Sequence, residues 1–329
     1  MEEVQMENQK EDMVAKEELR AKIVAIATQT VSNPGLEIAR LANAPYDVEL
    51  PVPEVIEAVF NVSRVERGED FDYFVQEPAA KTVYTVVSGS VTQTNVSMDS
   101  ENELSFSSYD SPEEYVYLDD LLDGKYDPIA KKADEQQEAL DRLEVKAVCD
   151  LLIAGAVAKS NTYAWTSGDV RMTFPKLVAM VRSVAKYGKN LVLITGSDVT
   201  TDVMLMDYYE NKNRAFTVDN MNVKHIPVES LTYTHSGTQT VLAADKAILV
   251  AVSDAKNRKP GEFVRRKISS VALGEGVTDK ERLVAQQGPI THVGSARKAA
   301  ITIVTYERFG AVLTNSYTIA VFKNDTSYS

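Results

Sequence analysis

Few residues in this chain have the types and spacing that nucleophilic or metal chemistry requires. The single cysteine, Cys149, lies in an apolar helical pattern, where its thiol would be buried and poorly ionised. His225, His235 and His292 lie beside no second His, Cys or Glu at ligand spacing, which a zinc site would need. These patterns predict no catalytic residue and no metal site.

A phosphate-binding loop is the next chemistry to consider. An apolar run at 190–194 predicts a strand, which leads through Thr195 and Gly196 into a helical pattern at 199–213. The chain has no GxxxxGK[ST] motif, and a single glycine cannot build a cradle of backbone amides around a phosphate. We therefore expect no cofactor, and we predict that Ser197 or Asp198 caps the N-terminus of the helix.

Paired carboxylates could perform acid–base catalysis only in a cleft that shifts their pKa values. The adjacent pairs Glu113-Glu114 and Asp119-Asp120 lie in a polar, loop-rich, acidic stretch instead, which favours solvated surface. A cytoplasmic α/β enzyme that uses a carboxylate pair in a deep polar pocket stays an alternative interpretation.

The charge of the chain is negative overall and divided along the sequence. A net charge of -13 argues against a general nucleic-acid binder, because such proteins attract phosphates with a basic field. Residues 99–144 hold fifteen Asp and Glu against four Lys and Arg, whereas residues 256–308 hold eleven Lys and Arg against five Asp and Glu. Either both segments are solvated surface, or they meet between copies of the chain and fix their register.

The elements that must position these residues change character along the chain. The first twenty residues are rich in Glu and Lys and predict a solvated arm without a core. Residues 22–41 form two short pieces separated by the turn signal Asn33-Pro34-Gly35. Between 71 and 118, short runs rich in Thr, Val, Tyr and Phe predict an extended hairpin, which would need a surface to lie on.

A long helix is predicted after Asp127-Pro128 and runs for about 28 to 30 residues. Its apolar repeat is too short for a coiled coil, so we expect it to pack on a sheet. One face is predicted to be buried and the other exposed. The expected buried residues are Leu140, Leu143, Ala147, Leu151 and Ala154, and the exposed ones are Lys131, Glu135, Glu138 and Arg142.

The C-terminal half predicts a mixed α/β structure. A helical pattern at 174–188 precedes the strand and helix already described, and further runs rich in β-branched residues follow. We predict strands over residues 223–228, 241–252, 265–273, 299–313 and 316–322.

The N-terminus lacks the basic start, apolar core and cleavage site of a secretory signal, and no apolar run approaches the ~18 residues of a membrane span. We therefore expect synthesis in the cytoplasm and no membrane partner. The sequons at Asn61, Asn95 and Asn324 would then have no route to glycosylation.

The order of these elements resembles the Hong Kong 97-type (HK97-fold) capsid protein of tailed bacteriophages along essentially the whole chain. KNLVLITGSDVTTDVML, NVKHIPV and AADKAILVAV resemble steps of that family's A-domain, and ARKAAITIVTYERFGAVLTNSYTIAVFKN resembles its closing strands. The resemblance implies an α+β fold. Its implied parts are an N-arm (1–40), the start of the P-domain (41–67), an extended β-hairpin called the E-loop (68–120), a P-domain with a long spine helix (121–189), a mixed α/β A-domain (190–300) and closing strands that return to the P-domain (301–329).

The same resemblance implies a non-enzymatic major capsid protein that self-assembles as pentamers and hexamers into an icosahedral phage head. The implied location is the virion, and the implied partners are further copies, packaged double-stranded DNA, and a scaffold, portal or decoration protein. Some members cross-link a Lys to an Asn, for which Lys81 is a candidate donor without a positional match for its partner. The run Arg265-Arg266-Lys267 supplies candidates for DNA contact. An encapsulin-like nanocompartment shell protein, which encloses cargo enzymes, is the alternative that the resemblance leaves open.

Overall fold

The computed structural model describes eleven segments of the chain. The expected arm, Lys81 and the residues at 76–100 lie outside them, as do Asp119-Asp120, His235 and His292. The described residues are 50–75, 101–117, 128–165, 172–188, 190–210, 223–230, 232–234, 238–252, 259–268, 280–290 and 300–324.

A six-stranded sheet is organised around one long strand, β14 (Ala300–Leu313). Its residue Glu307 is paired with Arg282 on one edge and with Tyr109 on the other, so β14 is central. All pairs are antiparallel except β1 with β12, which is parallel. One edge of β14 carries β13 (Arg282–Ile290) and then β12 (Gly261–Arg266) with β1 (Phe60–Val65), and the other carries β4 (Ser107–Asp110) and β5 (Glu114–Tyr117).

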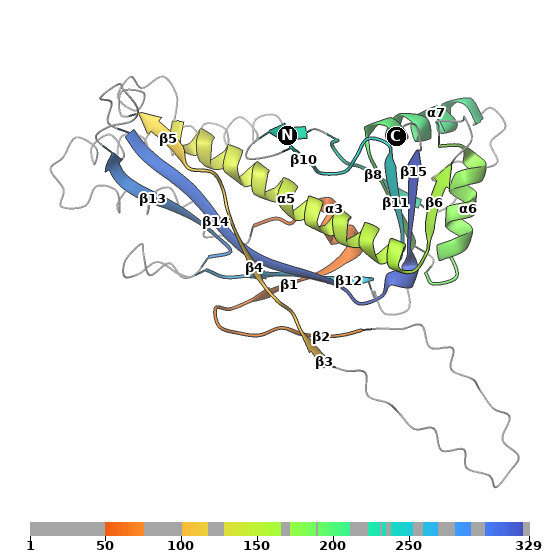
Figure 1. Cartoon of the computed structure of the whole chain (residues 1–329), viewed down its shortest axis with the longest axis horizontal. Helices are drawn as coiled ribbons and strands as arrows, with labels where there is room; N and C mark the ends of the chain where they lie inside the picture. The colour runs from red at the N-terminus through yellow and green to blue at the C-terminus, as the bar shows by residue number, and fades with distance from the viewer. Residues whose placement is uncertain are drawn as a thin grey trace, which may run out of the picture.

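A second sheet of five strands lies at the other end of the molecule (Figure 1). Helices α6 (Phe174–Val184) and α7 (Ser197–Glu210) cover one of its faces. The side chains of the second sheet alternate between facing these helices and facing α3 (Glu54–Val59) and α5 (Pro128–Ala158). The strand order is β6 (Thr162–Trp165), β15 (Ile319–Asn324), β11 (Lys246–Val252), β7 (Asn190–Thr195) and β8 (Val223–Pro227).

The strand β7 shows this alternation clearly. Leu191 and Leu193 pack with the buried side of α6, whereas Val192 and Ile194 face a second apolar cluster. All four are at most 5% exposed, as expected for a strand covered on both faces.

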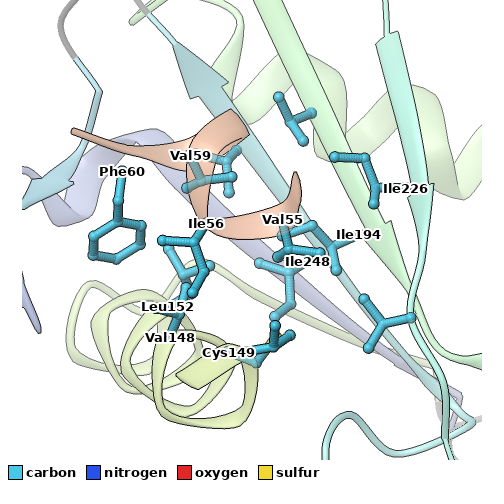
Figure 2. Close-up of a cluster of buried hydrophobic side chains, with 14 of the residues drawn as sticks. Val55, Ile56, Val59, Phe60, Val148, Cys149, Leu152, Ile194, Ile226 and Ile248 are labelled. Carbon is cyan, nitrogen blue, oxygen red and sulfur yellow. The ribbon is translucent and has the colours of Figure 1, made fainter. Parts of the chain in front are cut away.

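The helix α5 (Pro128–Ala158) runs along the first sheet and reaches the second (Figure 1). Its 31 residues span about 46 Å at 1.5 Å per residue. The short helix α3 (Glu54–Val59) lies against it, and Figure 2 shows Ile56 of α3 directed toward Val148 and Leu152 of α5. Gly155 permits close approach at the far end, because a Cβ there would lie 2.4 Å from Leu313 Cδ1.

A two-stranded ribbon projects from the body of the molecule (Figure 1). It pairs β2 (Asp72–Phe74) with β3 (Glu101–Glu103) in antiparallel fashion. Phe74 is 49% exposed and the adjoining Val75 is 39% exposed, so the ribbon presents apolar side chains to solvent.

The long helix was predicted correctly in extent, but the predicted buried face was displaced by about one residue. The sequence interpretation placed Ala154 inside and named no charged residue among the buried ones, whereas Ala154 is exposed and Glu144 is fully buried. The error arises because Gln136 and Glu144 occupy core positions, where each has polar partners. The observed buried line is Ala133, Gln136, Leu140, Glu144, Val148, Leu152 and Ala156.

The capping prediction for α7 was wrong. Thr200 N donates to Gly196 O (2.8 Å), which makes Gly196 the capping position and places Ser197 and Asp198 inside the first turn. Glycine is needed here because a Cβ would lie 2.2 Å from the backbone oxygen of Ala243.

Several strand boundaries also differ from the predicted ones. The strand expected at 265–273 is β12 at 261–266, since Gly261 allows the chain to pass against the ring of Phe60. The strand expected at 241–252 begins only at Lys246, and residues 316–318 form a 3-10 helix before β15. The strands at 223–228 and 299–313 were predicted correctly to within one residue. Strands β1, β6 and β13 and helix α3 were not predicted.

Candidate functional site

Among the described residues, a dense group of ionisable side chains lies beneath the middle of α5. Seven ionisable residues meet there from α5 and from the strands and turn it covers. We call this set the buried charge cluster. It consists of Arg64 (β1), Asp141 and Glu144 (α5), Arg265 (β12), Glu281 (preceding β13), Arg282 (β13) and Glu307 (β14).

Arg265 and Glu144 form the centre of the cluster. Arg265 Nε donates to Glu144 Oε1 (2.7 Å), and its Nη2 donates to Glu144 Oε2 (2.8 Å), which is a bidentate pair. Both side chains are 0% exposed. Arg265 Nη1 also donates to Glu281 Oε2 (3.2 Å), and Glu281 in turn pairs with Arg64. A charge buried this deeply is tolerated because every part of the guanidinium has an acceptor.

Arg282 completes the other side of the cluster. Its Nε donates to Glu307 Oε2 (2.9 Å), and its Nη2 lies 2.7 Å from Asp141 Oδ1 and 3.5 Å from Glu144 Oε2. Arg282 and Glu307 are 2% and 0% exposed. The helix is therefore joined to β12, β13 and β14 through charge–charge contacts over this stretch.

Two carboxyl groups of the cluster, Glu144 and Glu307, interact directly. Burial, together with the adjacent Glu144 carboxylate, raises the pKa of Glu307 to about 9, against the opposing effect of Arg282 and Arg265. Burial alone would raise the pKa of Glu144 as well, but hydrogen bonds to Glu307 and Arg265 outweigh it and hold that pKa below its ordinary value. One proton is thus retained on the Glu307 side of the pair.

The hydrogen-bond pattern supports this proton. Within the described residues, Glu307 Oε1 is buried without a hydrogen-bond donor. A proton on this oxygen would make it a donor toward Glu144. The proton also balances the charge, because the cluster holds three guanidinium groups against four carboxyl groups.

The cluster answers the question raised by the divided charge of the sequence. Asp141 and Glu144 belong to the acidic segment, and Arg265 and Arg282 belong to the basic one, so the segments meet inside a single chain at these positions. Neither predicted interpretation, solvated surface or contact between copies, describes these four residues. The burial also corrects one prediction for DNA contact, because the Arg265 side chain is wholly enclosed.

The two neighbours of Arg265 are closer to solvent but have partners. Arg266 lies over the ring of Phe106, 5.0 Å from its centroid, and its side chain is 16% exposed. Lys267 pairs with Glu66 at 2.5 Å.

Cys149 lies where the sequence predicted it. Its side chain is 0% exposed within the apolar cluster of α3, α5 and both sheets (Figure 2). Burial raises the pKa of the thiol to about 12, so it stays protonated and is a poor nucleophile at neutral pH.

The remaining candidates have structural partners. His225 Nε2 lies 2.7 Å from Thr195 Oγ1, and Glu114 pairs with Lys132 (3.1 Å). Asn61, in one of the sequons, donates to Glu262 Oε1 (2.8 Å). Across the described segments, no group of three His, Cys, Asp or Glu residues could hold a metal ion. No helix in those segments is long and apolar enough to cross a membrane.

The first backbone amides of α7 also donate to protein groups. The amides of Asp198 and Val199 donate to Ala244 O (3.1 and 3.3 Å), and the Ser197 amide donates to Ser230 Oγ (2.9 Å). Backbone and side-chain oxygens of the chain thus take the positions that a phosphate would need.

Comparisons with known proteins place this arrangement among phage structures. No family model and no curated protein matches the chain. A solved structure from Microbacterium phage Oxtober96 aligns with 14% identity over 85% of this chain and 93% of the other, with a TM-score of 0.53. One from Mycobacterium phage Adephagia aligns with 13% identity over 87% and 94%, with a TM-score of 0.53. The capsid structure of cyanophage P-SCSP1u aligns with 11% identity over 86% and 92%, with a TM-score of 0.48.

At these identities the first two alignments show a shared fold. The chain is a mixed α/β protein with the fold of these phage proteins, which confirms the resemblance noted in the sequence at the level of the fold.

Proposed function

We propose that the chain is a major capsid protein, a structural subunit that assembles as pentamers and hexamers into an icosahedral phage head. The observation that carries the proposal is the fold shared with phage proteins across almost the full length of both chains. The resemblance of the sequence to Hong Kong 97-type capsid proteins supplies the functional expectation. The location would be the virion, with packaged DNA on the inner face.

The finer parts of that family can be assigned by position. The ribbon β2–β3 and the residues between its strands would be the E-loop, and α5 would be the spine helix of the P-domain. The sheet formed with α6 and α7 would be the core of the A-domain. The strands of the two sheets do not keep to the expected boundaries. Strands β12 and β13 come from the range expected for the A-domain but pair with β14 in the first sheet, whereas β6 and β15 come from the ranges expected for the P-domain and the closing strands but join the second sheet.

The exposed ribbon supports assembly in particular. A two-stranded ribbon is marginally stable by itself in water, and this one leaves Phe74 and Val75 open to solvent. A neighbouring subunit would bury these side chains, and many such contacts per particle would add up to a stable shell.

The direct test is sedimentation and negative-stain electron microscopy of the purified full chain. We expect closed particles or rings of five and six subunits. A small oligomer that persists in virion-like salt and with co-expressed phage scaffold protein would contradict the proposal.

A shortened variant tests the role of the residues between the two strands of the ribbon. Replacing residues 76–100 with a short Gly-Ser turn keeps β4 and β5, which pair with β14 and belong to the body. We expect an unchanged thermal melting curve and a loss of particles. A variant that assembles like the full chain would show that residues 76–100 are not needed for assembly.

The contents of particles isolated from the native source separate the two kinds of shell. Nuclease-protected double-stranded DNA is expected for a phage head. A discrete cargo protein without DNA would support the nanocompartment alternative instead.

A further inference from the structure

An apolar groove opens between α3, the middle of α5 and the end of β8. Its volume is about 360 Å³. We call it the α3–α5–β8 groove. Its apolar lining is formed by Val52, Val55, Val145, Pro227, Val228 and Val241.

The charges at the groove are already paired within the chain. Arg142 donates to Glu138 (3.1 Å) and lies 3.8 Å from Glu229, while Asp141 contacts Arg282 in the buried charge cluster (2.7 Å). The free interaction capacity of the groove is therefore apolar, which suits aliphatic side chains better than a charged small molecule.

The described chain begins at the wall of this groove. Leu50 is the first described residue, and Pro51, Val52 and Pro53 line the groove directly after it. Two arginines fix the position of Leu50. Arg64 Nη2 donates to Leu50 O (3.0 Å), and Arg265 Nη1 donates to the same oxygen (3.1 Å). Forty-nine residues precede this point, and they must leave from the groove wall.

One segment of those forty-nine residues matches the groove in chemistry and in reach. Residues 36–41, LEIARL, follow the turn signal Asn33-Pro34-Gly35 and contain three large apolar residues, Leu36, Ile38 and Leu41. The nine steps from Leu41 to Leu50 span at most about 30 Å, so the segment stays near the groove. A tether of this length gives a high effective concentration. The Glu- and Lys-rich first twenty residues offer no comparable apolar set, and Ile23, Val24 and Ile26 lie before the turn on a longer tether.

We propose that residues 36–41 dock in the α3–α5–β8 groove of their own chain through Leu36, Ile38 and Leu41. The groove would then hold the root of the N-terminal arm against the body before any neighbour is present. This assignment does not depend on the capsid proposal, because it concerns a single chain.

Limited trypsin digestion of the unassembled full chain tests the docking. Arg40 lies inside the segment, whereas Lys10, Lys16 and Arg20 lie before it. The protection factor is the cleavage rate after Arg40 in a synthetic peptide of residues 30–49 divided by the rate at the same bond in the full chain. We expect protection of at least about tenfold at Arg40 and close to none at the earlier sites.

Two matched variants give the result its specificity. Leu36→Asp places a charge on a docking side chain and should reduce protection at Arg40 to about onefold, while Asn43→Asp adds the same charge outside the segment and should leave protection intact. Both positions precede the described residues, and the melting curve of each variant serves as a folding control. Absent protection in the natural chain, or equal protection in both variants, would overturn the proposal.

Dilution distinguishes docking of a segment of the same chain from docking of a second copy. Protection within one chain is independent of protein concentration over a hundredfold range. Protection that falls on dilution would assign the groove to a second copy and overturn the same-chain assignment. A chain that shows protection but never assembles would leave this inference standing and the capsid proposal refuted.

Discussion

The two halves of α5, residues 128–144 and 145–158, bury side chains of different kinds. The N-terminal half contacts the first sheet through Gln136 and Glu144, whereas the C-terminal half contacts both sheets through Val148, Leu152 and other apolar side chains. Glu144 and Leu152 are each 0% exposed. The comparison shows that burial along one helix does not require apolar residues, provided that the facing strands supply partners for every polar atom.

The polar half also fixes the position of the helix on the sheet more specifically. Gln136 donates to Ile303 O (3.1 Å) and accepts from Thr305 Oγ1 (2.7 Å), which fixes the helix against β14 at one register. The apolar half contacts the sheets mainly through aliphatic side chains, which impose no hydrogen-bond direction. We expect the two halves to respond differently to substitution and to pH, and three changes test that difference.

The largest effect is expected for Glu144→Ala. The substitution removes the bidentate partner of Arg265 and leaves its buried guanidinium without the Glu144 countercharge. This loss should lower the free energy of unfolding by about 3 to 5 kcal/mol. Urea denaturation of the unassembled chain measures the loss. The control is Glu138→Ala, because Glu138 forms an exposed pair with Arg142 on the same helix and should contribute less than about 1 kcal/mol. Equal losses in the two variants would contradict the polar-half assignment.

A somewhat smaller effect is expected for Leu152→Ala in the apolar half. Removing this fully buried side chain leaves a cavity and should lower the free energy of unfolding by about 3 kcal/mol. The loss should be the same at pH 6 and pH 9, because no titrating group is involved. Val157→Ala, at a position that is 58% exposed, should change the stability by less than about 0.5 kcal/mol. A strongly pH-dependent loss in Leu152→Ala would show that the two halves are coupled.

The third change, Glu307→Gln, alters the pH dependence of stability more than the stability itself. The folded chain keeps a proton on Glu307 up to about pH 9, whereas the unfolded chain releases it near the ordinary carboxyl value of 4.5. The stabilisation from this group is therefore complete below about pH 4.5 and is lost as the pH rises toward 9. Glutamine cannot titrate, and its amide can donate to Glu144 as the protonated acid does.

Urea denaturation between pH 6 and pH 9 measures this prediction. The natural chain should lose stability relative to Glu307→Gln by up to about 1.4 kcal/mol per pH unit. Glu138→Gln, on the exposed face, should follow the natural chain in parallel. If Glu307→Gln also followed it in parallel, the proton would not be held by this pair.

Local patterns predicted part of this fold. The long helix, the strand after Asn190 and the strand after Ala300 each have a strong periodic or apolar signal within one segment. The burial of Cys149 followed in the same way, from the apolar residues around it. The strand β13 was missed because Gln286-Gln287-Gly288-Pro289 has little intrinsic strand preference, and its pairing with β14 defines it instead.

The buried charge cluster could not be predicted from local sequence. Arg265 and Glu144 are 121 residues apart, and an isolated Arg-Arg-Lys run is typical of a solvated surface. A signal was present in the helix itself, since Gln136, Leu140, Glu144 and Val148 share one face at steps of four. Recognising Glu144 as buried would have required the location of a cation on the facing strand, which only the three-dimensional pairing supplies.

The burial of Cys149 has a practical consequence for labelling. The described thiol is the chain's single cysteine, and it is both enclosed and protonated at neutral pH. Maleimide reagents, which react with accessible thiolates, should therefore leave the folded chain unmodified. A cysteine introduced at any exposed position would then become a unique attachment point for a fluorophore or a gold particle, present once in every chain.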